Sequence, residues 1–362
     1  MKKVKYNIID LFCGCGGISQ GYFQTNRINI VGAIDFNQVA CDTYKLNFPS
    51  ANVICCDITN QSVNETNFKD IDIIVGGPPC QGFSALNRHN KNLEDDPRNI
   101  LFLQFIRFVK EIHPKAIMIE NVRQILTQKD GFARKSICKM LDDLGYNVSY
   151  QVLNAADFGV PQKRMRAIFI GVQKEIGKFD FKAIDKYKVS KFTTVEEALG
   201  DLYTTENNKV ENQSIYEIDK NFKSDYLIKM HDNTGKVCNH LIKYPNIRVQ
   251  KRISYVPSGG NWKNVPEELF PSKRNNRHSN YMRRLNRFGQ SITIDTGHDV
   301  YFHPIYNRVP TVRESARIQS IPDKFKFTGT RNEQLRQVGN AVPPMLAENI
   351  AKGVIEFLDN EK

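Results

Sequence analysis

A cysteine directly after two prolines is the residue of this sequence best suited to nucleophilic chemistry. Cys80 follows Gly76–Pro79 (GGPP), which ends an apolar run, Ile71–Val75, typical of a buried strand. The two prolines have a fixed φ and supply no N–H, so the segment is stiff where it leaves the strand. A stiff support can hold a thiol in place for attack on a substrate. Most free cysteines are only small buried thiols, so the prediction also depends on what stands nearby.

Acidic residues stand at or just after the ends of four other extended runs. They are Asp10, Asp35, Asp57 and Glu120. Because ligands bind at the carboxyl ends of strands in open α/β sheets, this set together with Cys80 predicts a pocket. The turn Gly14–Gly17 lets a ligand approach the backbone at a helix N-terminus. Asp35 stands about twenty residues further on, where an acid commonly binds ribose hydroxyls.

The glycine spacing favours a methyl donor over a dinucleotide. A phosphate-binding turn normally reads GxGxxG, whereas Gly16-Gly17 is followed here by ISQG. Asp10, which comes before the turn, would repel a pyrophosphate and suits a positively charged ligand. S-adenosylmethionine carries an ammonium and a sulfonium group and fits such a site. A dehydrogenase would share the turn and Asp35 but would bind a ligand of the opposite charge.

Two arginines in the segment Gln162–Arg166 (QKRMR) add positive charge to the predicted pocket. Alternate side chains of a strand share one face, which puts Gln162, Arg164 and Arg166 on one side and Met165 on the other. Directed at an acidic pocket, the two guanidiniums suit a carboxylate, a carbonyl or a phosphate. A surface strand can show the same alternation without binding anything.

These residues are positioned by a predicted alternation of strands and helices. Strands are predicted at 6–10, 28–35, 52–56, 71–75, 116–120, 148–154 and 164–172. Helices are predicted from Ile18, after the N-cap residue Asn37, and over Arg98–Ile112. The pattern predicts an α/β fold with a mainly parallel sheet and helices on both faces. From about residue 174 to 310 the periodicity is weak, which predicts a smaller, irregular second domain.

The chain is strongly basic, and the charge is unevenly placed. The net charge is +12, and Lys243–Arg287 alone holds eleven basic residues against two acids, or +9. Aromatic and amide side chains are interleaved with this charge, which suits phosphate neutralisation combined with base-edge contacts. The segment therefore predicts binding to nucleic acid.

Composition bounds the class of protein. A hydrophobic content of 40% and a charged content of 25% are ordinary for a soluble globular protein of 362 residues. No apolar run approaches the ~20 residues that span a bilayer, and the basic start MKKVKYNIIDLF does not fit a signal peptide. We therefore expect a cytoplasmic protein without membrane contact. The eight cysteines include no CxxC pair, so no metal site is predicted.

Taken together, the motifs resemble those of the cytosine-C5 DNA methyltransferases of bacterial restriction-modification systems. They stand in the family's order as DLFCGCGG (10–17), GGPPCQGFS (76–84), ENV (120–122), QKRMR (162–166), TVRESARIQSIPDKF (311–325) and QVGNAVPP (337–344). Cys13 and Cys15 depart from the usual first motif but are small. Asp35-Phe36 stands where other members often carry Glu and Trp, and it retains an acid and an aromatic ring.

The resemblance implies a Rossmann-like methyltransferase domain and assigns catalytic roles. Cys80 would be the nucleophile that adds to C6 of a cytosine flipped out of the duplex. Glu120 would contact N3 and the exocyclic amine of the base, and Asn121 would fix the turn at this strand end. Arg164 would hold the O2 carbonyl, while Arg166 is the candidate that stabilises the thiolate.

Binding residues follow from the glycine turn, the basic segment and the resemblance. For S-adenosylmethionine, whose product is S-adenosylhomocysteine, they are Asp10, Phe12, Gly14, Gly16, Asp35, Phe36, Asp57, Ile58, Pro79, Leu101, Asn340 and Val342. For double-stranded DNA they are Gln81, Ser84, Arg98, Arg248, Lys251, Arg252, Arg274, Arg277 and Arg283. Arg284 is either a further DNA contact or a structural residue.

The resemblance also implies a domain order and partners. A catalytic domain at 1–185 would precede a target-recognition domain at 186–330, and the segment 331–362 would return to the first domain. We expect a monomer that acts on duplex DNA, with a cognate restriction endonuclease as a partner in the same system.

Three alternatives stay open. A tRNA methyltransferase of the family would usually carry a PCQPFT-like loop and a CFT tripeptide, an adenine amino-methyltransferase would need PPY or PPW, and a silent DNA-binding regulator would not need Cys80, Glu120, Arg164 and Arg166 together.

Overall fold

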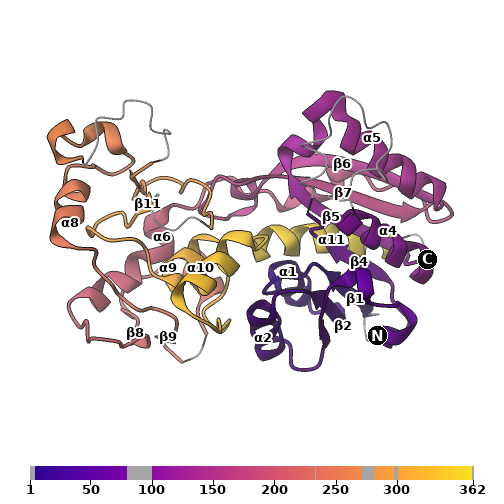
Figure 1. The fold of residues 1–362 in the computed structure, drawn as a ribbon, viewed down its shortest axis with the longest axis horizontal. Coiled ribbons are helices and arrows are strands. Elements are labelled where there is room, and N and C mark those ends of the chain that lie inside the picture. The colour runs from indigo at the N-terminus through magenta and orange to yellow at the C-terminus, as the bar shows by residue number, and fades with distance from the viewer. Residues whose placement is uncertain (1–4, 80–99, 233, 271–280, 297–300, 361–362) are drawn as a thin grey trace. The chain divides into compact units, whose positions relative to one another are not determined.

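The apolar runs of the first half form one seven-stranded sheet in the computed structural model, which describes residues 5–79, 100–232, 234–270, 281–296 and 301–360. The strands are β1 (Tyr6–Leu11), β2 (Ile28–Asp35), β3 (Asn52–Cys55), β4 (Ile73–Gly76), β5 (Ala116–Val122), β6 (Tyr146–Asn154) and β7 (Met165–Gln173). Strands β1 to β5 run parallel, whereas β7 is antiparallel to both β5 and β6. The predicted α/β class and mainly parallel sheet are confirmed (Figure 1).

The strand order creates a place for a ligand at the carboxyl ends of β1 and β4. The order is β3-β2-β1-β4-β5-β7-β6, so the chain leaves β1 toward one edge of the sheet and later returns to β4 on its other side. In the register of these neighbours Asp10 lies opposite Val75 and Leu11 opposite Gly76. Ligands of open α/β sheets bind where the strand order reverses. The first glycine turn and the GGPP segment therefore leave the sheet side by side.

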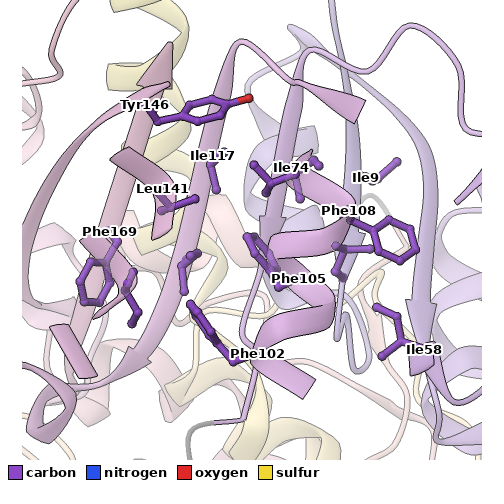
Figure 2. Packing of buried hydrophobic residues seen from close by; sticks show 14 of the residues in the cluster. Ile9, Ile58, Ile74, Phe102, Phe105, Phe108, Ile117, Leu141, Tyr146 and Phe169 are labelled. Carbon is purple, nitrogen blue, oxygen red and sulfur yellow. The ribbon is translucent and has the colours of Figure 1, made fainter. Parts of the chain in front are cut away.

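One face of the sheet is covered by α4 (Ile100–Ile112) and α5 (Gln128–Asp143). Phe102, Phe105 and Phe108 recur at helical spacing on α4 and are fully buried. Figure 2 shows them with sheet residues such as Ile74 and Ile117, which belong to the same apolar cluster. Removing one of these rings would cost about 3–5 kcal/mol of stability. The core thus fixes β4, which precedes Cys80, and β5, which carries Glu120.

Further helices of this part are α1 (Gly17–Gln24), α2 (Gln38–Asn47) and α11 (Pro344–Asn360). Helices α1 and α11 pack closely, because a Cβ on Gly21 would lie 2.4 Å from the carbonyl oxygen of Pro344. The Tyr6 hydroxyl donates a 2.8 Å hydrogen bond to Asp359 near the end of α11. The C-terminal helix therefore belongs to the same compact unit as β1. No helix within the described residues is long and apolar enough to cross a membrane.

The chain divides into two compact units. The first comprises residues 1–158, 165–188 and 342–362, and the second comprises 159–164 and 189–341. The predicted C-terminal segment began at residue 331, whereas here α10 (Arg331–Asn340) lies in the second unit and only α11 in the first. The other elements of the second unit are α6 (Val195–Leu199), β8 (Tyr216–Glu217), α7 (Asp225–Met230), β9 (Lys236–Val237), α8 (Ile247–Ser254), β10 (Arg283–Arg284), β11 (Tyr301–Phe302) and α9 (Val312–Ile318).

Buried ion pairs hold this second unit together where regular structure is sparse. Arg308 is 1% exposed and bonds Glu314 at 2.8 Å and Glu206 at 2.9 Å. Arg317 is fully buried between Asp323, at 2.7 Å, and Asp201. Buried charges of this kind require partners on several segments, because an unpaired one would be strongly destabilising. The partners join segments about a hundred residues apart in the chain.

Candidate functional site

Glu120 and Arg166 form an ion pair at the carboxyl end of β5. Arg166 Nε donates to Glu120 Oε1 at 2.8 Å, and the two side chains are only 15% and 13% exposed. The pair follows from the antiparallel register, in which Val122 lies opposite Arg166. A Cβ on Gly77 would lie 3.3 Å from Glu120 Oε2, so glycine at that position lets the carboxylate lie close to the backbone. The acid therefore borders the segment that leads to Cys80.

Asn121 ties the GGPP segment to β5. Its Nδ2 donates a 2.9 Å hydrogen bond to the carbonyl oxygen of Pro78, and its Oδ1 accepts one from the N–H of Val122. The bond to Pro78 is buried, so its loss would leave that carbonyl without a partner among the described residues, at a cost of about 1–3 kcal/mol. The stiff segment is thus held two residues before Cys80. Cys80 itself, with Gln81, Ser84 and Arg98, lies outside the described residues.

Arg164 and Gln162, predicted on one face with Arg166, form hydrogen bonds with residues of the second unit. Arg164 is 2% exposed, and its Nη1 and Nη2 donate to the carbonyl oxygens of Ile294 and Gly339 at 3.0 and 2.9 Å. Gln162 Oε1 accepts a 3.0 Å hydrogen bond from the N–H of Ile294. The chain passes from the second unit to the first between residues 164 and 165. Alternation along a strand does not anticipate this division.

Asp10 presents an unusual carboxylate at the end of β1. It is fully buried, and its Oδ2 accepts a 2.7 Å hydrogen bond from the Ser19 hydroxyl, which in turn lies 2.6 Å from the Tyr44 hydroxyl. Its Oδ1 has no hydrogen-bond partner among the residues that the structure describes. Burial raises the pKa of Asp10 to about 7. The sequence motif indicated the acid, but no signal pointed to Ser19 and Tyr44.

Asp35 shapes the glycine turn from the neighbouring strand. Its Oδ2 accepts from the N–H of Gly14 at 2.8 Å and its Oδ1 from the N–H of Asn37 at 2.9 Å. Burial raises the pKa of its carboxyl, and these hydrogen bonds oppose that shift. Each carboxylate oxygen can accept a second hydrogen bond. Phe36, the next residue, is 76% exposed and offers an open aromatic face at the same strand end.

The turn itself needs glycine, because Gly14 has a φ of +52° and Gly16 a φ of +97°. A Cβ on Gly16 would lie 2.7 Å from the ring of Phe48, whereas the space at Gly14 is open. The structure thus places a bare backbone position next to Asp35. This combination can accept hydroxyl groups beside a flat ring system.

The remaining residues predicted to bind S-adenosylmethionine differ in how far they are exposed. Asp57 is exposed, and its Oδ1 accepts from the N–H and hydroxyl of Thr59, which lower the pKa of its carboxyl. Ile58 is 4% exposed and belongs to the core cluster, against which Phe12 and Leu101 are partly buried. Pro79 is partly buried in the first unit. Asn340 is exposed at the end of α10 in the second unit, and Val342 is buried in the first.

The predicted DNA contacts divide into exposed and structural arginines. Arg248 and Lys251 are exposed on α8, Arg252 is partly buried there, and Arg283 is partly buried on β10; Arg274 and Arg277 lie outside the described residues. Arg284 is a structural residue, since it is 5% exposed and donates to the carbonyl oxygens of Ile253, Val256, His303, Ile305 and Tyr306.

Comparison with known proteins places these features in context. Residues 6–356 match the model of a family described as C-5 cytosine-specific DNA methylase. Type II methyltransferase M1.HphI of Haemophilus parahaemolyticus is 36% identical over 360 residues, covering 98% of this chain and 87% of that protein. Type II methyltransferase M.DdeI of Desulfomicrobium norvegicum is 35% identical over 377 residues, covering 98% and 89%. A solved structure titled as a prophage-encoded DNA modification methyltransferase of E. coli superimposes with a TM-score of 0.80 at 28% identity, covering 98% of this chain and 100% of that one.

Proposed function

Because the chain belongs to the C-5 cytosine-specific DNA methylase family, we propose that it methylates cytosine C5 in duplex DNA through an adduct between Cys80 Sγ and C6 of the base. The observation that carries this proposal is the bond from Asn121 to the Pro78 carbonyl. It joins the strand that bears Glu120 to the stiff segment that ends at Cys80. An acid and a nucleophile are thereby assigned to one strand end.

The adduct is needed because C5 of cytosine is a weak nucleophile. Attack of the Cys80 thiolate on C6 forms the S–C6 bond and moves the electron pair of the C5–C6 double bond toward C5, which can then take a methyl group. Loss of the C5 proton to a base and elimination of the thiolate restore the double bond. Reaching C6 requires the base to leave the duplex, at a cost of a few kcal/mol.

Glu120 and Arg166 would complement the charge that the ring acquires. We assign Glu120 to N3 and the exocyclic amine, where a shared proton neutralises the developing negative charge. Arg166 bonds Glu120 directly, so we assign to Arg166 both the orientation of this acid and the contact to the O2 carbonyl. The resemblance assigned O2 to Arg164, whose guanidinium donates to two backbone carbonyls. We propose that Arg164 positions the start of β7.

The methyl donor that we propose is S-adenosylmethionine, and the residues at the ends of β1 and β2 fit it. The buried Asp10 oxygen without a partner suits a cationic group, and the Asp35 carboxylate with the exposed Phe36 ring suits a ribose and an adenine. The donor supplies an electrophilic methyl group on sulfur. Asp10, Asp35 and the Gly14 backbone would hold and orient it.

Replacing Asp10 by asparagine should make stability less dependent on pH. Because burial raises the pKa of Asp10 to about 7, the folded protein keeps this proton between about pH 4 and 7 while the unfolded chain loses it. Stability from this group is therefore full below pH 4 and falls as pH rises through 7. At pH 8 we expect Asp10→Asn to melt at a higher temperature than the parent, because its free energy of unfolding is larger by an amount on the order of a few kcal/mol, with a smaller difference at pH 5.

The same variant tests donor binding. S-adenosylhomocysteine should raise the melting temperature of the parent but little that of Asp10→Asn, whereas Asp42→Asn, on an exposed position of α2, should behave as the parent. Equal stabilisation of Asp10→Asn and the parent by this ligand would remove Asp10 from the donor site.

Replacing Asn121 by alanine should slow methylation without weakening donor binding. The Pro78 carbonyl would lose its partner and the segment before Cys80 would gain freedom, and misplacement by about 1 Å can cost 100-fold in rate. We expect a fall of about 10–100-fold in the single-turnover rate. Asn29→Ala, which removes an exposed Asn29–Asn7 hydrogen bond, is the matched control. A parental rate in Asn121→Ala would show that this anchor does not position the nucleophile.

The proposed activity is tested by incubating the purified protein with plasmid DNA and S-adenosylmethionine tritiated in its methyl group. Label should enter duplex DNA and co-elute with 5-methylcytosine after digestion to nucleosides. Bisulfite sequencing of the same plasmid would give the target sequence. Label on tRNA alone, or on another base, would contradict the proposal.

We further propose that the second unit recognises the target sequence and that the protein works as a monomer in the cytoplasm. The exposed basic residues Arg248 and Lys251 on α8 support a DNA-facing role for this unit. A cognate restriction endonuclease would be the partner expected of a Type II system. Sedimentation of the protein alone and with a short duplex would test the monomer.

A further inference from the structure

A basic cleft of about 790 Å³ lies within the second unit. It is lined by the segments 191–194 and 288–293 together with Lys163, Gly259, Arg283 and Asn286. Among the described residues that line it, Lys163, Lys191 and Arg283 are cations and none is acidic. Of the predicted DNA contacts that the structure describes, only Arg283 lines this cleft. Lys163 and Lys191 lie outside the basic segment 243–287 and were not predicted as DNA contacts.

The floor of the cleft is held by backbone pairing. The N–H of Lys163 donates to the carbonyl oxygen of Ser291, and the N–H of Ser291 donates to that of Pro161, both at 2.9 Å. The Thr293 hydroxyl donates a 2.8 Å hydrogen bond to the carbonyl oxygen of Lys163. These bonds fix the backbone that carries Lys163 while its side chain is exposed. The charge is therefore presented from a preformed surface.

The cleft also contains aromatic rings and an unsatisfied amide. Phe192 and Phe288 are 52% and 72% exposed, which is high for such large apolar side chains. Gln290 Nε2 is buried and has no hydrogen-bond partner among the described residues. A buried donor without a partner is unfavourable, so an incoming acceptor oxygen would find it ready to bind. Cations, exposed rings and an amide donor together match the groups of a polynucleotide.

We propose that this cleft is a contact site for the DNA substrate, in which Lys163, Lys191 and Arg283 neutralise phosphates. Gln290 then donates its free N–H to an acceptor oxygen or nitrogen of the DNA. Lys191 also lies 3.4 Å from Glu197, but both ends of that pair are accessible to water, so it competes weakly with a phosphate. The inference deepens the proposed recognition role of the second unit and rests on the methylation of DNA by this chain.

The test removes the two exposed lysines together and measures the salt dependence of binding. Each phosphate contact contributes about 0.9 to the slope of log K against log salt concentration for duplex DNA. We expect Lys163→Gln/Lys191→Gln to lower the slope by about 2 and to weaken binding roughly 60-fold at 0.1 M salt. Lys220→Gln/Lys229→Gln, at exposed positions of the same unit, removes the same charge and should leave the slope unchanged.

Methylation measured at saturating DNA separates this inference from the function on which it rests. The Lys163→Gln/Lys191→Gln protein should melt at the parental temperature, which shows that it is folded, and the Lys220→Gln/Lys229→Gln protein should methylate saturating DNA at the parental single-turnover rate. An unchanged slope in this variant would overturn the inference while leaving the methyltransferase proposal intact. An equal loss in the control pair would overturn it too, because the effect would then be one of net charge alone. If the Lys163→Gln/Lys191→Gln protein bound polyglutamate more weakly than the parent but kept the parental salt slope for DNA, the inference would be wrong and the cleft would be assigned to an acidic protein. A parent that fails to methylate DNA would instead refute the proposed function.

Discussion

Replacing Cys80 by serine should abolish DNA methylation while leaving DNA binding in place. A serine hydroxyl is not ionised near neutral pH and is a poor nucleophile without a base to activate it, whereas a thiol with a pKa near 8.5 supplies some thiolate. We expect the single-turnover rate to fall by at least about 1,000-fold, the scale seen when a covalent nucleophile is removed. The measurement is transfer of labelled methyl groups at saturating DNA and donor.

Cys138→Ser is the matched control for this prediction. Cys138 is a free, partly buried thiol on α5, where it packs against the core rather than standing at a strand end. Its replacement should leave the methylation rate close to that of the parent. Retention of even a tenth of the parental rate in Cys80→Ser would show that the sulfur does not form the adduct.

Disrupting the Glu120–Arg166 pair should have the second largest effect. Glutamine at position 120 has the same shape but cannot share a proton with N3, so we expect Glu120→Gln to slow methylation by about 100- to 10,000-fold. Arg166→Ala would remove the guanidinium that lies 2.8 Å from the Glu120 carboxylate, and it should slow methylation to a similar degree. Because the two residues act as one unit, the double variant should be little slower than the slower single variant.

The controls address charge and folding. Lys139→Ala breaks the exposed Lys139–Asp143 pair on α5 and should change neither rate nor stability measurably. Arg166→Lys keeps the charge but not the planar fork, so it should restore only part of the lost rate. If the fold-losses in rate of the two single variants multiplied in the double variant, Glu120 and Arg166 would act independently. The proposed orientation of the acid by the guanidinium would then be wrong.

Local sequence signals were enough to predict the elements that position the site. The strand 28–35 has the predicted bounds, because its apolar residues are flanked by polar and turn-forming ones. Asn37 accepts a hydrogen bond from the N–H of Ala40, as its position before a helix indicated. The strand ahead of Cys80 begins at Ile73 rather than at the predicted Ile71.

What the sequence could not predict depends on contacts between distant residues. The ion pair of Glu120 with Arg166 requires β7 to run antiparallel beside β5, which no local pattern specifies. Arg284 and Arg283 are adjacent in the sequence, yet Arg284 is buried among backbone carbonyls and Arg283 lines a cleft. Composition gives the number of charges in a segment but not which of them tertiary packing will bury.

The covalent step itself is tested most directly with DNA that carries 5-fluorocytosine. After methyl transfer to such a base, C5 holds fluorine in place of the proton that must leave, and fluorine cannot depart as a cation, so the thiolate stays bonded to C6. We predict a complex that survives denaturation, forms only when the methyl donor is present, and yields on digestion a peptide modified at Cys80. An adduct at another residue would contradict the proposal that Cys80 adds to the base. So would the absence of any adduct with fluorinated DNA if the protein methylates the same DNA without fluorine.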